Sequence, residues 1–149
     1  MKYDGDDFKR DFLRRTLTLI KEYEGPYDAT FLVNCLLGLL VVPKEAWYED
    51  IPKEDFNSLS DWGIRPDSIT PGKCKYGYEH QPNLRQLVTK LRNAVAHFDV
   101  EPIIKGNEVG GFLFKDWDGF CAALSLGEIE AFVHHLASHL GEERRQTNE

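Results

Sequence analysis

An arginine, an asparagine and a histidine occupy one short stretch of this chain, Leu91-Arg92-Asn93-Ala94-Val95-Ala96-His97. In a helix, Asn93 and His97 lie one turn apart, and Arg92 stands beside them. A guanidinium binds the charge of a phosphate, and an imidazole exchanges protons near neutral pH. These side chains therefore suit chemistry on a phosphodiester, and the small alanines between them leave room for a ligand to approach.

An amphipathic helix that begins at Pro82-Asn83 is predicted to carry these residues. Its apolar residues recur at intervals of three and four, at Leu84, Leu87, Val88, Leu91, Val95 and Phe98. At 100° per residue, Leu91 lies at the centre of the apolar stripe, and Arg92, Asn93 and His97 fall on the opposite side. The pattern predicts a helix that buries one face and presents the motif on the other.

The elements that must position this helix are mostly helical. In chain order, the patterns predict a helix over 6–23 and a second from Asp28 to Pro43, followed at 45–48 by a short helical turn or the tail of that second helix. The motif helix comes next, then a β-hairpin of 100–104 and 109–114, and a last helix after the capping-box pattern Ser125-Leu126-Gly127-Glu128. The second helix is apolar on nearly every side, which is typical of a bundle centre or a subunit interface. We therefore expect a mainly α fold, an antiparallel helical bundle with one small hairpin.

Residues 51–82 form a long segment rich in Pro, Gly, Ser and Asp. We expect Phe56, Leu59, Trp62 and Ile64 to attach part of it to the body of the protein. The segment also mixes basic and aromatic residues, at Lys73, Lys75, Tyr76 and Tyr78. Such a mixture can stack bases and hold phosphates, or it can be a surface loop with ordinary aromatic anchors.

Length and charge limit the class of protein. The 149 residues predict one domain over 1–149, with a core at about 6–140 and a polar tail at 142–149. The net charge of -7 argues against a bulk electrostatic nucleic-acid binder, while it is compatible with a basic partner protein or with an RNA enzyme that has a local basic cleft. Arg85 and Lys90 lie on the polar side of the motif helix with Arg92 and are the candidates to form that cleft.

Three widely spaced cysteines, Cys35, Cys74 and Cys121, predict neither a disulfide framework nor a zinc site. The acidic N-terminal residues do not match a signal peptide. The longest apolar run, Phe31 to Val42, is interrupted by Asn34 and is too short to span a bilayer. We therefore expect a cytoplasmic protein without a membrane segment.

The sequence resembles the HEPN superfamily, whose active members are metal-independent ribonucleases. The resemblance is carried by Arg92-Asn93, three further residues and His97 near the end of a helix, and by the preceding apolar helix with its internal Asn34. The layout is similar to small single-domain members that are often encoded on plasmids and in defence loci. It extends over roughly residues 6–140.

The resemblance implies an active site between two motif helices that face each other across the dyad of a homodimer. The implied reaction is attack of a ribose 2′-hydroxyl on the adjacent phosphorus, which leaves 2′,3′-cyclic phosphate and 5′-hydroxyl ends without a metal or cofactor. His97 would act as general acid or base, and Arg92 would stabilise the developing charge. Asn93 would orient the phosphate or the imidazole, or help to hold the dimer. The implied role is RNA restriction by a toxin or phage-defence effector, with an antitoxin protein as a possible partner.

Three alternatives remain open at the level of sequence. Asn34 either ties two helices together as a buried amide, or orients the motif helix or contacts RNA in the cleft. The fold could also serve as a non-catalytic module that dimerises, docks a partner or binds RNA. His135 and His139, one turn apart in the last helix, have a spacing that could hold a metal. No H-E-x-x-H arrangement accompanies them, so a solvated helix face is the preferred interpretation.

Overall fold

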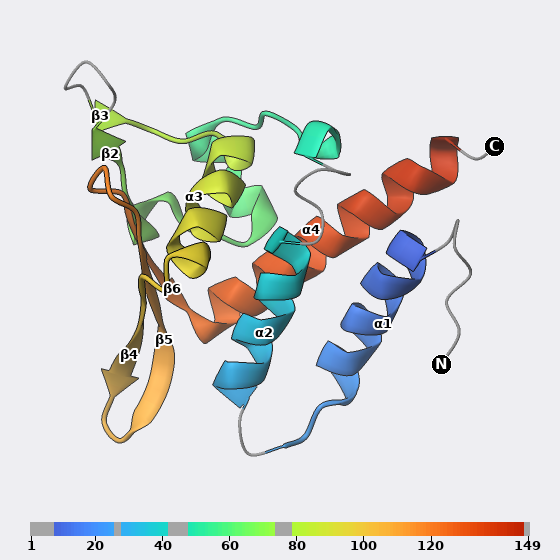
Figure 1. Cartoon of the computed structure of the whole chain (residues 1–149), viewed down its shortest axis with the longest axis horizontal. Coiled ribbons are helices and arrows are strands. Elements are labelled where there is room, and N and C mark those ends of the chain that lie inside the picture. The colour runs from blue at the N-terminus through green and yellow to red at the C-terminus, as the bar shows by residue number, and fades with distance from the viewer. Residues whose placement is uncertain (1–7, 26–27, 42–47, 74–78, 148–149) are drawn as a thin grey trace.

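A computed structural model describes residues 8–25, 28–41, 48–73 and 79–147 (Figure 1). In these residues, the α-helices are α1 (Phe8–Glu22), α2 (Asp28–Val41), α3 (Leu84–Ala96) and α4 (Leu126–Thr147). Each of these predicted helices is confirmed, although α4 continues well past the residues that the apolar pattern marked. Short 3₁₀ helices lie between α2 and α3, namely η1 (Tyr48–Asp50), η2 (Phe56–Trp62) and η3 (Pro66–Ser68).

The strands form more than the single hairpin that we expected. A four-stranded antiparallel sheet has the order β1-β6-β5-β4. Its strands are β1 (Ile69–Thr70), β4 (Val100–Lys105), β5 (Glu108–Lys115) and β6 (Cys121–Ser125). A two-stranded ladder joins β2 (Gly72–Lys73) to β3 (Glu79–His80). The expectation of a mainly α bundle with one small hairpin is therefore wrong, and the fold is mixed α and β.

The predicted hairpin is β4 with β5, and its extension to β6 was missed for a physical reason. β6 is five residues long and buries only Ala122 and Leu124, so its apolar pattern is short. Short strands are specified by the partner they pair with more than by their own propensity. β5 supplies that partner on one edge, and the two residues of β1 pair on the other edge of β6.

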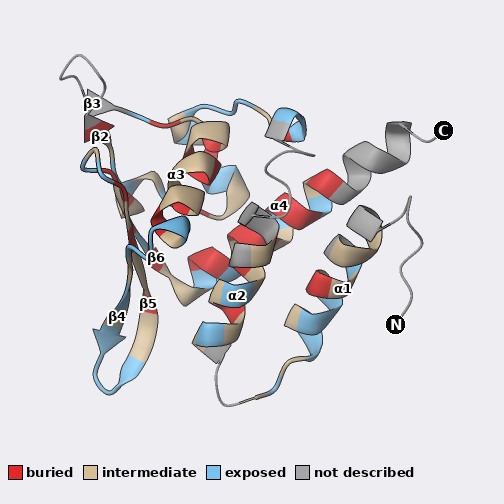
Figure 2. Ribbon diagram, in the orientation of Figure 1, coloured by how far each residue is buried: buried red, intermediate tan, exposed pale blue. Residues whose placement is uncertain are grey.

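Helix α3 lies between the sheet and the other helices (Figure 1). It packs against β5 on one side and α2 on the other, while α4 contacts α1, α2, β5 and β6. Figure 2 shows the buried residues concentrated where these elements meet. The core includes Leu36 of α2, Leu91 of α3, Phe114 of β5 and Phe132 of α4, all without exposed surface.

The segment between α2 and α3 is attached to this core as predicted. Leu59 and Ile64 are fully buried, and Phe56 and Trp62 are packed against the core. The predicted turn at 45–48 falls largely outside the described residues, and so do Lys75, Tyr76 and Tyr78. In the part of the chain that the structure describes, no helix is long and apolar enough to cross a membrane.

The carboxylate of Glu128 fastens this segment to the start of α4. Its oxygens accept hydrogen bonds from the Ser68 hydroxyl at 2.8 Å and from the backbone N–H of Arg65 at 3.1 Å. Glu128 also closes the predicted capping box with Ser125, whose Oγ accepts from the Glu128 N–H at 3.1 Å. Burial would raise the pKa of Glu128, but these hydrogen bonds and the charge of Arg65 lower it below its ordinary value.

We predict that Gly111→Ala destabilises the sheet much more than Gly110→Ala. A Cβ at Gly111 would stand 2.2 Å from the carbonyl oxygen of Leu124 in β6, which cannot move without breaking the ladder. A Cβ at Gly110 would meet only the flexible side chain of Lys105, at 3.0 Å. We expect Gly111→Ala to cost about 1–3 kcal/mol of unfolding free energy in urea titrations. Equal losses in the two variants would contradict the close packing of β5 on β6.

We predict that Glu128 stabilises the fold in a pH-dependent way. Its folded-state pKa is lowered, so its contribution is complete above the unfolded pKa of about 4.3 and is lost as the pH falls through the folded pKa. Glu128→Gln should therefore be less stable than the wild type at pH 7, and the difference should shrink below about pH 4. The exposed neighbour Glu130, changed to Gln, is the control. A difference that is constant with pH would contradict the interpretation.

Candidate functional site on helix α3

The start of α3 is fixed by a capping box. The Asn83 side chain accepts from the Gln86 N–H at 2.8 Å, and the Gln86 side chain accepts from the Asn83 N–H at 3.0 Å. The buried residues of the helix are Leu84, Leu87, Val88, Leu91 and Ala94. This matches most of the predicted apolar stripe, so the helix is rotated as predicted and Arg92 and Asn93 are only partly buried.

The helix ends directly at the motif histidine. His97 is the C-cap residue and is exposed, and its backbone N–H donates to the Asn93 carbonyl at 3.0 Å. Phe98 then takes a left-handed conformation with φ 58°. The Phe98 N–H bonds to the Val95 carbonyl and the Asp99 N–H to the Ala94 carbonyl, which is the Schellman pattern.

Phe98 was predicted to belong to the apolar stripe, and that prediction is wrong. The left-handed turn ends the helical periodicity, so the Phe98 side chain is 91% exposed. Glycine is the usual residue at this position because a Cβ is strained there. A large apolar side chain therefore occupies a strained, solvent-exposed position directly after His97.

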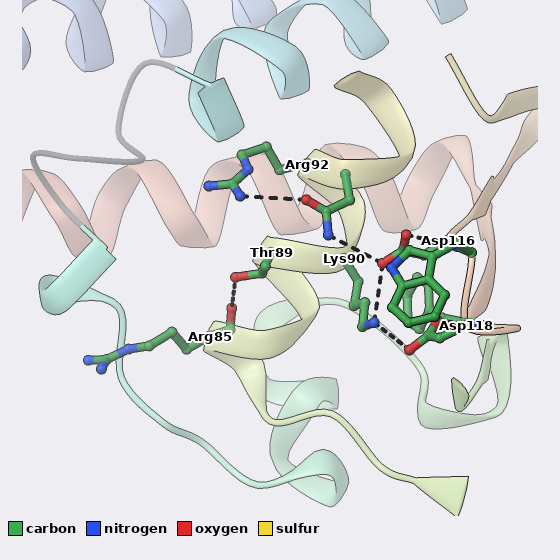
Figure 3. Close-up of polar contacts among 9 residues, drawn as sticks. Arg85, Thr89, Lys90, Arg92, Asp116 and Asp118 are labelled. Carbon is green, nitrogen blue, oxygen red and sulfur yellow. Dashed lines mark hydrogen bonds and ion pairs between the residues drawn. The ribbon is translucent and has the colours of Figure 1, made fainter. Parts of the chain in front are cut away.

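Asn93 connects Arg92 to Asp116, the residue that follows β5. Arg92 and Asp116 are labelled in Figure 3. A guanidinium nitrogen of Arg92 donates to the Asn93 Oδ1 over 3.5 Å, and the Asn93 Nδ2 donates to the Asp116 Oδ2 over 3.3 Å. Asp116 directly follows β5, and its side chain is only 2% exposed. The structure thus brings Arg92 and Asn93 into contact and adds a buried carboxylate that the sequence patterns did not single out.

Lys90 faces the same carboxylate and a second one. Its ammonium lies 3.2 Å from the Asp116 Oδ2 and 2.5 Å from the Asp118 Oδ2. Partial burial would lower the pKa of Lys90, but the hydrogen bonds and charges of the two aspartates raise it. The charge of Lys90 is therefore balanced within the protein, which reduces what it can contribute to a basic cleft.

Arg85 points away from Lys90 and its two aspartates, toward the segment before α3 (Figure 3). Its guanidinium donates to the carbonyl oxygens of Ile51 at 2.8 Å and Glu49 at 2.9 Å, and lies 3.6 Å from the Glu49 carboxylate. Its side chain is 14% exposed. Arg85 thus holds the chain around η1 against α3, and the structure does not place it with Arg92 and His97.

Asn34 is exposed on α2, so the interpretation as a buried amide that ties two helices together is wrong. The apolar run around it is not uniformly buried, because one side of α2 reaches solvent while Leu32 and Leu36 face the core. Among the described residues, no hydrogen bond joins Asn34 to Arg92, Asn93 or His97.

A family model described as HEPN pEK499 p136 matches residues 1–147 of this sequence. The chain belongs to the HEPN family. Comparison with curated proteins and with solved structures gave no match. The match covers all of α1, α2, α3, α4 and the four-stranded sheet. The HEPN assignment therefore concerns the whole fold and not only the Arg92–His97 stretch.

Residues of the turn between β5 and β6 lie against α3, the helix that carries the HEPN motif. Its sequence, Asp116-Trp117-Asp118-Gly119, is a turn pattern between two apolar runs and could have indicated a second hairpin. Trp117 is 88% exposed, while Asp116 and Asp118 face Lys90. Nothing in the local sequence shows that this turn reaches α3, because that contact is made between residues far apart in the chain.

The histidine pair of this HEPN chain lies on α4. The His139 Nε2 is 3.3 Å from the Asp50 carbonyl oxygen, and its ring packs edge-on against Trp62 with centroids 5.2 Å apart. His135 lines the same shallow pocket as His139, Asp61 and Trp62. Among the described residues, no group of three or more His, Cys, Asp or Glu side chains could hold a metal.

We predict that Phe98→Gly stabilises this HEPN chain. The left-handed backbone strains any residue with a Cβ by about 1–2 kcal/mol, and the exposed ring gains little from packing. Phe98→Ala removes the ring but keeps the Cβ, and therefore serves as the matched control. We expect the glycine variant to exceed both the wild type and the alanine variant in melting temperature. A glycine variant no more stable than Phe98→Ala would contradict the strain.

Proposed function

We propose that this HEPN protein is a metal-independent endoribonuclease that acts in RNA restriction, as a toxin or phage-defence effector. The observation that carries the proposal is the placement of Arg92 and His97 on the outward side of α3, with His97 exposed at the end of the helix. A phosphate-binding cation and a proton-transferring group thus stand on the same helix within about one and a half turns of each other, and the imidazole is open to solvent. Membership of the HEPN family supports the same assignment.

In the proposed reaction, the ribose 2′-oxygen attacks the adjacent phosphorus and the bond from phosphorus to the 5′-oxygen breaks. His97 accepts the proton of the 2′-hydroxyl, and a second imidazole protonates the leaving 5′-oxygen. Arg92 stabilises the charge on the phosphorane-like transition state. The products are a 2′,3′-cyclic phosphate and a 5′-hydroxyl, so the atoms and protons balance without a metal.

A homodimer is part of the proposal because one chain offers a single motif histidine. Two motif helices that face each other across a dyad supply His97 of the partner subunit as the second proton-transfer group. They also double the number of arginines at the phosphate. An antitoxin protein that covers this cleft is a further proposed partner.

RNA binding by an acidic chain needs a source of affinity other than bulk charge. Lys90 and Arg85 are engaged within the protein, and the net charge is -7. Phe98 and Trp117 are the two most exposed large apolar side chains among the described residues, and they follow His97 and Asp116 directly. Aromatic rings stack on unpaired bases irrespective of protein charge, which favours single-stranded RNA as the substrate.

The alternative is a non-catalytic HEPN module that dimerises, docks a partner or binds RNA. The exposed aromatic side chains beside the motif are compatible with it as well. Oligomeric state does not distinguish the two functions, because both include a dimer. Toxicity on expression in cells distinguishes them, since a binding module should remain equally toxic or harmless after His97→Ala.

We predict that His97→Ala and Arg92→Ala each abolish RNA cleavage without unfolding the protein, because one loses the proton-transfer group and the other the phosphate-binding charge. Purified protein is incubated with total RNA in EDTA, and the ends of the products are analysed. The exposed His135→Ala is the control, since it removes an imidazole from α4 and leaves α3 intact. Full activity in both motif variants, with the fold verified by circular dichroism, would refute the assignment.

A further inference from the structure

The buried carboxylate of Asp116 is surrounded by donors from two elements. It accepts from the Trp117 N–H at 2.8 Å within its own turn, and from the Asn93 Nδ2 at 3.3 Å and Lys90 Nζ at 3.2 Å on α3. Burial would raise the pKa of Asp116, but these hydrogen bonds and the charge of Lys90 lower it below its ordinary value. Asp116 is therefore an ionised group that only accepts hydrogen bonds at neutral pH.

An ionised acceptor fixes which way the Asn93 amide points. The nitrogen must face Asp116, so the oxygen is left to face the guanidinium of Arg92, 3.5 Å away. A flipped amide would place its oxygen against the carboxylate and its nitrogen against the guanidinium, and both contacts would be repulsive. Only one orientation of the Asn93 amide therefore forms both hydrogen bonds, one to Asp116 and one from Arg92.

The position of α3 is also held by contacts that do not involve Asp116. Its apolar face is held by fully buried residues such as Leu87 and Leu91. Its end is joined to the sheet by the bond from the Lys115 N–H to the Asp99 carbonyl at 3.0 Å. Asp116 therefore acts on the direction of side chains more than on the placement of the helix.

We propose that Asp116 is a positioning residue of the HEPN site, which orients the Arg92 guanidinium through the amide of Asn93. The proposal rests on the proposed function for its effect on cleavage, but the orientation of Arg92 can be measured without activity. Asp118 provides a matched comparison. Asp118 is also an aspartate that pairs with Lys90. It differs in its other partner, because its carboxylate accepts a hydrogen bond from the Phe120 N–H at 3.1 Å, whereas the carboxylate of Asp116 accepts one from the Asn93 side chain.

The first experiment is a double-mutant cycle of Asp116→Asn and Asn93→Ala, with kcat and KM measured for RNA cleavage. We expect Asp116→Asn to lower kcat by about 10- to 100-fold, because a misdirected guanidinium no longer meets the transition-state charge. In the Asn93→Ala background the same change should have little further effect, because the connection to Arg92 is already broken. Asp118→Asn should leave kcat near the wild-type value. Equal losses in both backgrounds, or equal losses from Asp116→Asn and Asp118→Asn, would overturn the proposal.

The second experiment follows the Arg92 Nε–H signal by NMR, assigned by its loss in Arg92→Lys. Asp116→Asn should shift this signal, Asp118→Asn should not, and Asp116→Asn should have no effect once Asn93 is alanine. An Arg92 signal that is unchanged by Asp116→Asn would overturn the proposal. If the wild type does not cleave RNA but the signal responds as expected, the proposed ribonuclease fails while the positioning by Asp116 stands.

Discussion

The burial of one face of α3 is the constraint on which the site depends. Leu84, Leu87 and Leu91 have no exposed surface, and the helix packs between β5 and α2. Each such side chain contributes about 1.5–3 kcal/mol when it leaves water, so rotation of the helix is strongly opposed. Because the apolar face cannot turn outward, Arg92 and Asn93 cannot turn inward, and the direction of the polar groups follows from the packing of the apolar ones.

Electrostatics adds a second constraint at the junction of α3 with the sheet. A carboxylate as buried as Asp116 must be given donors, and the nearest are Asn93, Lys90 and the backbone of its own turn. These contacts fix the orientation of the Asn93 amide and neutralise the charge of Lys90 within the protein. The protein therefore presents few uncompensated cations on α3, so substrate capture in the proposed function relies on stacking and on Arg92 more than on long-range attraction.

At the end of α3, a residue that lowers the stability of the helix end presents a large aromatic ring to solvent. A Schellman turn would be most stable with glycine at position 98, yet the chain has phenylalanine there, in a left-handed backbone and largely in solvent. Strained residues of this kind occur preferentially where a protein binds or reacts. Its place directly after His97, together with the exposed Trp117 after Asp116, gives the proposed RNA site its apolar components.

Local patterns in the sequence are sufficient for the helices and for the motif. The helical periods, the capping box at Ser125 and the β4–β5 hairpin follow from the spacing of apolar and turn residues. The Arg92–His97 motif, together with the apolar helix that precedes it, indicates the HEPN family. The four-stranded sheet, the exposure of Asn34 and Phe98, and the meeting of Asp116 with Asn93 emerge only in the folded chain. These features depend on contacts between distant segments, or on a single backbone angle that ends a helix. The spacing of residues in a local stretch of sequence predicts neither the distant contacts nor the backbone angle, because the interactions that stabilise them form only when the chain has folded.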